Sequence, residues 1–113
     1  MKRPVQSERD FQTAVVRYAR IMGWRIAHFR PAQMRSGAWA TPMQGDPGFP
    51  DLVMVRGGRV VFAELKRVGK KPQDLQSAWL DDLKACDGVE VYVWTADHWD
   101  AIEVVLGKER KAS

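Results

Sequence analysis

Two carboxylates and a lysine flank an apolar, β-branched stretch, GFPDLVMVRGGRVVFAELKR, which spans residues 48–67. Asp51 stands before the first apolar run, and Glu64 and Lys66 stand at the end of the second. Burying charged side chains costs free energy unless each charge finds a partner. Carboxylate oxygens brought together in such a segment are suited to holding a cation, so their relative placement decides what they can do.

The glycine pair Gly57-Gly58 predicts a two-residue β-hairpin turn between the two apolar runs. If these glycines are the loop residues, Arg56 faces Arg59, and continuing the register outward places Asp51 opposite Glu64 unless a bulge shifts it by one residue. Directly opposed side chains share a face, with Cβ atoms roughly 4.5–5.5 Å apart. Lys66 lies on that face too, because side chains alternate along a strand.

Two opposed carboxylates in apolar surroundings repel each other, so the pair either shares a proton or binds a cation. Lys66 supplies one positive charge, whereas a divalent ion supplies two, and hard oxygen ligands favour Mg²⁺ or Mn²⁺. A structural salt bridge among Asp51, Glu64 and Lys66 is the plain alternative, and it is the more common explanation of this spacing taken alone. Three other features favour a metal site. They are the GFPD segment before the first strand, the basic connector after the second strand, and a carboxylate on the first helix, Glu8.

The charge is distributed unevenly along the 113 residues. Residues 1–71 hold 14 Lys and Arg against 5 Asp and Glu, whereas residues 72–106 hold 1 against 8. A one-sided basic surface suits a polyanion such as nucleic acid, although it also serves simply to keep a protein in solution.

The remaining pattern predicts one α/β domain, residues 1–113. Ser7 is a suitable N-cap for a helix whose apolar stripe runs from Phe11 to Met22 and which ends at Gly23. Alternation predicts a strand over 24–30, with Trp24, Ile26 and His28 on one face and Arg25, Ala27 and Phe29 on the other.

Residues 31–50 show no period and are predicted to form a long loop. Pro72 opens a second helix whose expected inward stripe is Leu75, Trp79, Leu83 and Cys86. Residues 89–94 predict a strand, and residues 97–106 a closing helix with a strand as the alternative.

Two further polar residues lie near the predicted inward faces of the helices. Glu8 shares a helix face with Phe11, Val15 and Tyr18, which places its carboxylate at the N-terminal end of the inward stripe. Gln76 borders the apolar face of the second helix. Their ordinary roles would be a favourable helix-dipole interaction for Glu8 and a surface amide for Gln76.

Taken together, these motifs resemble a known family of nucleases. GFPD ending at Asp51, followed by Glu64-Leu65-Lys66, looks like the PD-(D/E)xK signature, and the Gln76-bearing helix followed by a Val-rich strand is similar to the VRR-NUC (virus-type replication-repair nuclease) group. The resemblance covers residues 8–94. It implies a restriction-endonuclease-like core, a mixed central β-sheet flanked by helices in the order α-β-β-β-α-β.

The resemblance also implies roles for individual residues. Asp51 and Glu64 would bind Mg²⁺ or Mn²⁺ with the Leu65 backbone carbonyl, and Lys66 would orient water or stabilise charge at the phosphate. Glu8 looks like the accessory carboxylate of the first helix and a further metal ligand, and Gln76 like the glutamine near the site. The implied reaction is hydrolysis of phosphodiester bonds in DNA.

Candidate DNA contacts are of two kinds. Cations near the site are expected to hold the phosphate backbone without reading sequence. Trp39, in the loop, is a candidate for stacking on an unpaired base or, equally, for anchoring the loop. The cations are Arg67, Lys70 and Lys71 after the hairpin, and Arg30 and Arg35 in the loop.

Minimal VRR-NUC proteins resemble Holliday-junction resolvases, which implies a homodimer acting on branched DNA such as four-way junctions. Candidate interface residues, each with a core position as the alternative, are Trp94, Trp99, Val104 and Val105.

The cellular setting is expected to be the cytoplasm of a bacterial or phage-infected cell. The single cysteine, Cys86, excludes an internal disulfide, and the start MKRPVQSERD has no apolar signal region. No apolar run reaches the ~18 residues of a membrane span. Two other functions stay open: a nucleic-acid-binding module that keeps the nuclease fold without catalysis, and a structural protein of a phage or mobile element.

Overall fold

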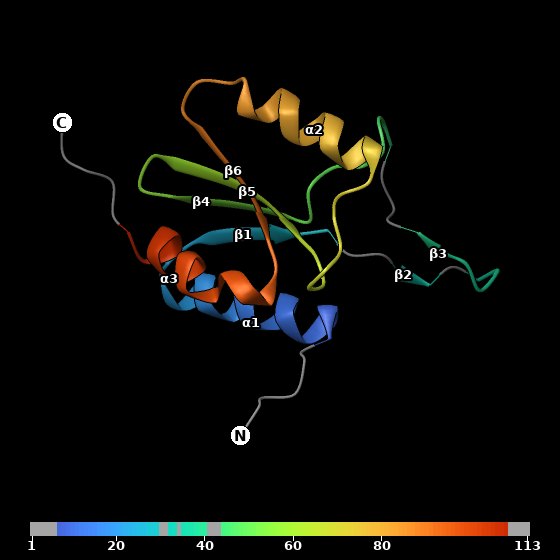
Figure 1. Ribbon diagram of the computed structural model, residues 1–113, viewed down its shortest axis with the longest axis horizontal. Helices are drawn as coiled ribbons and strands as arrows, with labels where there is room; N and C mark the ends of the chain where they lie inside the picture. The colour runs from blue at the N-terminus through green and yellow to red at the C-terminus, as the bar shows by residue number, and fades with distance from the viewer. Residues whose placement is uncertain (1–6, 30–31, 34, 41–43, 109–113) are drawn as a thin grey trace.

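A mixed four-stranded sheet with helices on both faces forms the centre of the protein (Figure 1). The computed structural model describes residues 7–29, 32–33, 35–40 and 44–108, of which 32–33 and 39–40 are described by their backbone alone. The elements are α1 (Glu8–Ile21), β1 (Arg25–His28), β2 (Ala32–Gln33), β3 (Trp39–Ala40), β4 (Leu52–Arg56), β5 (Arg59–Leu65), α2 (Asp74–Lys84), β6 (Val89–Trp94), the 3₁₀ helix η1 (Ala96–His98) and α3 (Trp99–Gly107).

The sheet confirms the predicted hairpin. Its strand order is β1-β4-β5-β6, with β1 and β4 antiparallel, β4 and β5 antiparallel, and β5 and β6 parallel. Arg56 pairs with Arg59 and Leu52 pairs with Ala63, which is the expected register. Both turn glycines have positive φ, +57° for Gly57 and +82° for Gly58, as a type I′ turn requires. The α/β class and the mixed sheet are therefore as expected.

The main hydrophobic core lies between one face of the sheet and the pair of helices α1 and α3 (Figure 1). The expected stripe of α1 is confirmed at its centre, where Phe11, Val15 and Ala19 are buried. Residues 97–106 form η1 and most of α3, so the strand alternative is wrong there. Within the described ranges, no helix combines the length and apolar character needed to cross a bilayer. The sheet residues under these helices are Leu52, Met54, Val61, Ala63 and Leu65.

The second helix is rotated relative to its predicted stripe. Leu80 is its buried residue, Gln76 is half-buried, and Leu75 and Cys86, both expected inside, are exposed. The less exposed positions include 76, 79, 80 and 83, and the Trp79 ring packs edge-on against Phe49 at 5.0 Å. An apolar stripe alone could not reveal that a glutamine occupies an inward position.

Two other expectations need correction. The segment 31–50 contains a short antiparallel pair, β2 with β3, where no regular structure was expected. In Figure 1 this pair lies apart from the four-stranded sheet, on the side where β4 begins and β5 ends. Its two-residue strands are too short to give a visible sequence period. The strand predicted over 24–30 is shorter, Arg25–His28, although its inward face is as expected.

The four candidate interface residues do not share one environment. Trp94 is in the core at 3% exposure, and Trp99 and Val105 are half-buried against the core. Only Val104, with 68% of its surface exposed, lies on the outside. Trp94, Trp99 and Val105 therefore fit the core alternative, whereas Val104 does not.

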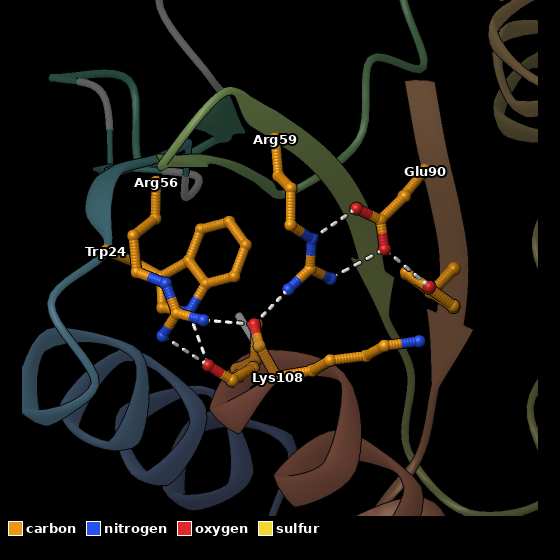
Figure 2. A network of polar contacts seen from close by, with 7 residues as sticks. Trp24, Arg56, Arg59, Glu90 and Lys108 are labelled. Atoms are coloured by element: carbon orange, nitrogen blue, oxygen red, sulfur yellow. Dashed lines mark hydrogen bonds and ion pairs between the residues drawn. The ribbon is translucent and has the colours of Figure 1, made fainter. Parts of the chain in front are cut away.

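A polar network ties the last turn of α3 to the hairpin turn (Figure 2). Arg59 binds Glu90 through two hydrogen bonds of 2.7 Å, and Arg56 donates to the carbonyls of Met22 and Leu106 at 2.8 Å. Both guanidinium groups lie within 5 Å of the Trp24 ring centroid, at 4.7 and 4.9 Å. Bidentate ion pairs and cation–π contacts of this kind hold a helix end in place.

The ion pair lowers the pKa of Glu90 through its hydrogen bonds to Arg59, while burial acts in the opposite direction. The network lies at the Gly57-Gly58 end of the hairpin, whereas Asp51 and Glu64 lie at the other end. It stabilises the fold without taking part in the candidate site.

Candidate functional site

Asp51 and Glu64 meet at the open end of the hairpin. The last pair in the ladder is Leu52 with Ala63, so the same register brings the next two residues, Asp51 and Glu64, to opposite positions. Asp51 is fixed from two sides. Its Oδ2 accepts a 2.9 Å hydrogen bond from the amide of Leu65, and its carbonyl accepts one of 2.8 Å from the amide of Phe29.

Glu64 is a fully buried carboxylate with incomplete hydrogen bonding. Only 1% of its surface is exposed. Its Oε1 accepts a 3.3 Å hydrogen bond from Gln76 Nε2 and lies 3.9 Å from Lys66 Nζ, whereas its Oε2 has no hydrogen-bond partner in the described part of the protein. Leaving a buried carboxyl oxygen without a hydrogen-bond partner is costly, so this oxygen requires an explanation.

The amide of Gln76 is oriented by the start of its own helix. Its Oε1 accepts a 2.9 Å hydrogen bond from the backbone amide of Gln73, which directs Nε2 toward Glu64. The same residue thus caps α2 and contacts the carboxylate pair. The surface-amide alternative for Gln76 is therefore not what the structure shows.

Burial is the main cause that raises the pKa of Glu64, to about 9 from its ordinary value of 4.5. The negative charge of Asp51, a hydrogen bond that the protonated acid can form with Asp51, and the charge of Glu8 act in the same direction. The positive charge of Lys66 lowers the pKa of Glu64, but by less than the other causes raise it. Without another cation, Glu64 therefore keeps a proton at neutral pH.

The pair can be satisfied by a proton held between the carboxylates or by a divalent cation. One ammonium at 3.9 Å cannot satisfy both carboxylates, and Oε2 of Glu64 has no donor among the described residues. The donor set consists of hard oxygens, which suit Mg²⁺ or Mn²⁺. The residues that would hold such an ion are Asp51 and Glu64, and the Leu65 carbonyl is the third ligand that the resemblance implies.

Glu8 is the carboxylate of α1 that the resemblance assigns to the site. It is exposed at the start of α1 and acts on Glu64 through its charge. Among the residues that the structure describes, no group of three or more His, Cys, Asp and Glu side chains is arranged to hold a metal ion. Glu8 as a direct ligand therefore stays a prediction.

Gly48 is a site residue to which the sequence alone assigned no role. Its φ is +96°, and a Cβ built on it would lie 2.7 Å from the carbonyl carbon and oxygen of Leu75 and 2.9 Å from the amide nitrogen of Gln76. The backbone of the GFPD segment thus touches the first turn of α2, which holds Gln76 beside Glu64. A glycine three residues before the candidate aspartate was the available signal, because close backbone approach requires glycine.

The predicted nucleic-acid contacts fall into two groups. Arg67, Lys70 and Lys71 are exposed in the connector that follows β5, Glu64 and Lys66 in the sequence. Arg35 is exposed between β2 and β3. Arg30 and the side chain of Trp39 lie outside the described part of the protein.

Comparisons of the sequence and the structure with protein-family models, with curated proteins and with solved structures gave no match. The likeness to VRR-NUC nucleases therefore rests on the residues quoted above and on their placement. Any functional conclusion therefore depends on the geometry of the site around Asp51 and Glu64.

Proposed function

We propose that the protein is a metal-dependent endonuclease that hydrolyses phosphodiester bonds in DNA, with a restriction-endonuclease-like core. One observation carries the proposal. Glu64 is buried opposite Asp51, lacks a donor for Oε2 within the described ranges and has a lysine beside it. A purely structural role would leave this arrangement at a permanent energetic cost, whereas an incoming divalent cation removes it.

The residues of the site have two proposed roles, binding the metal ion and orienting the carboxylates. Asp51 and Glu64 would hold Mg²⁺ or Mn²⁺, together with the Leu65 carbonyl. When bound, such an ion supplies Lewis-acid activation of the phosphate and of a water molecule. The amide of Leu65 and the carboxamide of Gln76 orient the two carboxylates through their hydrogen bonds at 2.9 and 3.3 Å.

Lys66 is placed to act on the reacting phosphate. Its side chain is only 15% exposed, and its ammonium stays on the carboxylate face of the sheet end. A fixed positive charge in a partly buried site stabilises negative charge that develops on phosphate oxygens. The family likeness gives Lys66 the same role.

The substrate proposal follows from charge and from the family likeness. The exposed cations of the connector follow the site directly and suit a phosphate backbone. The likeness to minimal VRR-NUC proteins extends the proposal to a homodimer acting on branched DNA such as four-way junctions.

Cleavage assays test this proposal. Labelled four-way junction, flap, single-stranded and duplex DNA are incubated with Mg²⁺ or Mn²⁺. We expect cutting by the wild type that EDTA abolishes, and that falls by on the order of 10²–10³-fold or more in Asp51→Ala and Lys66→Ala. Asp81→Ala, which removes an exposed carboxylate from α2, should cut at the wild-type rate.

Two results would count against the nuclease. If the wild type binds these DNAs and cuts none of them with either metal, the protein is a binding module with the nuclease fold. If cutting persists unchanged in both site variants, a contaminating enzyme or another site is responsible.

A further inference from the structure

An open hollow of about 380 Å³ lies between α1 and the edge strand β1. Its lining includes the apolar side chains of Val16 and Ile21 and the guanidinium-bearing side chains of Arg17 and Arg20. Ile21 is 70% exposed although it is aliphatic. The hollow is lined by Thr13, Val16, Arg17, Arg20, Ile21 and His28.

The hollow has two positively charged side chains that can bind an anion. Arg17 and Arg20 are exposed, and within the described ranges neither forms an ion pair. The acidic helix α3 packs on another flank of α1, where Tyr18 contacts Trp99 and Glu103. Positions 18 and 20 point about 200° apart on a helix, so the carboxylates of α3 do not neutralise these arginines.

The hollow is also close to the candidate site. His28, at its edge, pairs with Leu52, the residue after Asp51, and the amide of Phe29 binds the Asp51 carbonyl. Along α1, Arg17 lies nine residues from Glu8, whose charge acts on Glu64, and this separation is about 14 Å at 1.5 Å per residue.

We propose that this hollow binds the DNA strand beside the cleaved phosphate, with phosphate oxygens on Arg17 and Arg20 and a sugar or base against Val16 and Ile21. Arginine binds phosphate through paired N–H donors, and an aliphatic lining suits the uncharged part of a nucleotide. The proposal rests on the proposed nuclease function for the identity of the substrate. It adds a positioning surface on α1 to the connector cations.

Binding measured in EDTA tests the hollow separately from catalysis. Fluorescence anisotropy follows a labelled junction and a labelled single strand as salt is varied. We expect Arg17→Ala/Arg20→Ala to weaken binding by roughly 10- to 100-fold and to reduce the slope of log affinity against log salt by between one and two units. Ile21→Asp, which keeps both arginines, should weaken binding by a similar factor.

Lys84→Ala is the control for loss of an exposed cation elsewhere, and it should change affinity less than twofold. The hollow is excluded if the arginine variant loses no more affinity than this control, or if its salt dependence equals that of the wild type. It is excluded equally if the variant changes only the oligomeric state in sedimentation, because the surface is then a protein interface. If the wild type cuts no DNA but the variants bind DNA more weakly, the proposal that the hollow binds DNA stands and the nuclease proposal is wrong.

Discussion

Glu64→Gln should make the metal-free protein more stable at neutral pH while it abolishes cleavage. The wild-type carboxyl has a pKa of about 9 in the folded protein and an ordinary value of 4.5 when unfolded. At pH 7 the unfolded protein has therefore lost a proton that the folded protein retains, which favours unfolding. Over these 2.5 pH units, at 1.36 kcal/mol per unit, the expected gain of the variant is at most about 3 kcal/mol.

The direction of the pH effect is opposite to that of an ordinary salt-bridged carboxylate. Because folded Glu64 binds a proton that the unfolded protein releases, wild-type stability should fall as pH rises from about 4.5 to 9. Glutamine carries no titrating proton, and its amide can donate toward Asp51, so the variant should lack this slope.

Urea unfolding in EDTA at pH 5, 7 and 8.5 measures both quantities. Glu103→Gln, which removes an exposed carboxylate of α3, is the matched control and should keep the wild-type slope. Equal pH slopes for wild type and Glu64→Gln would show that Glu64 is ionised in the folded protein. The statement that Glu64 keeps a proton in the metal-free folded protein would then be wrong.

Gly48→Ala should destabilise the protein and impair cleavage through Gln76. The new Cβ would meet the backbone of Leu75 and Gln76 at 2.7–2.9 Å, and helix backbone does not rotate away as a flexible side group does. The first turn of α2 must therefore move, and with it the hydrogen bond from Gln76 to Glu64. We expect a loss of about 2–4 kcal/mol, from overpacking together with an unfavourable φ.

Gly45→Ala separates the two causes. Gly45 has a similar φ of +105°, but nothing lies within 4 Å of a Cβ at that position. This control should lose about 1–2 kcal/mol from backbone strain alone and keep its cleavage rate. Thermal unfolding and cleavage of the preferred DNA are measured for both variants. If the two alanines behave alike, the contact between Gly48 and α2 does not position the site.

The hairpin could be predicted in detail because its constraints are local. A two-residue glycine turn sets the register, and the strict alternation of a strand then places Asp51 opposite Glu64. The stripe of α1 was equally readable, since Phe11, Val15 and Ala19 repeat at helical spacing. Neither feature depends on distant parts of the sequence.

The rotation of α2 could not be predicted, because a tertiary contact determines it. Trp79 packs against Phe49, 30 positions earlier in the sequence, and Gly48 allows the backbone of that segment to reach Leu75. These contacts turn Gln76 inward and leave Leu75 58% exposed. Apolar periodicity places Trp79 and Leu83 inward correctly, but it also places Leu75 inward and Gln76 only at a border.

The sequence gives no signal for the arginines of α1 for a related reason. Arg17 and Arg20 lie on the polar side of the helix, where charged residues are ordinarily solvated. Only the fold shows that this side adjoins His28, which pairs with Leu52, the residue after Asp51. A basic side of a helix can be interpreted as a binding surface only when its neighbours in the fold are known.

Binding of Mn²⁺ to the protein without DNA tests the central claim most directly. Calorimetric titrations at pH 7 in two buffers of different ionisation enthalpy give both the affinity and the number of protons released. We expect saturable binding that Asp51→Asn removes, with release of about one proton per ion bound between Asp51 and Glu64, because Glu64 must lose its proton to ligate. Absence of saturable binding, or equal binding by Asp51→Asn, would contradict a metal site at the carboxylate pair.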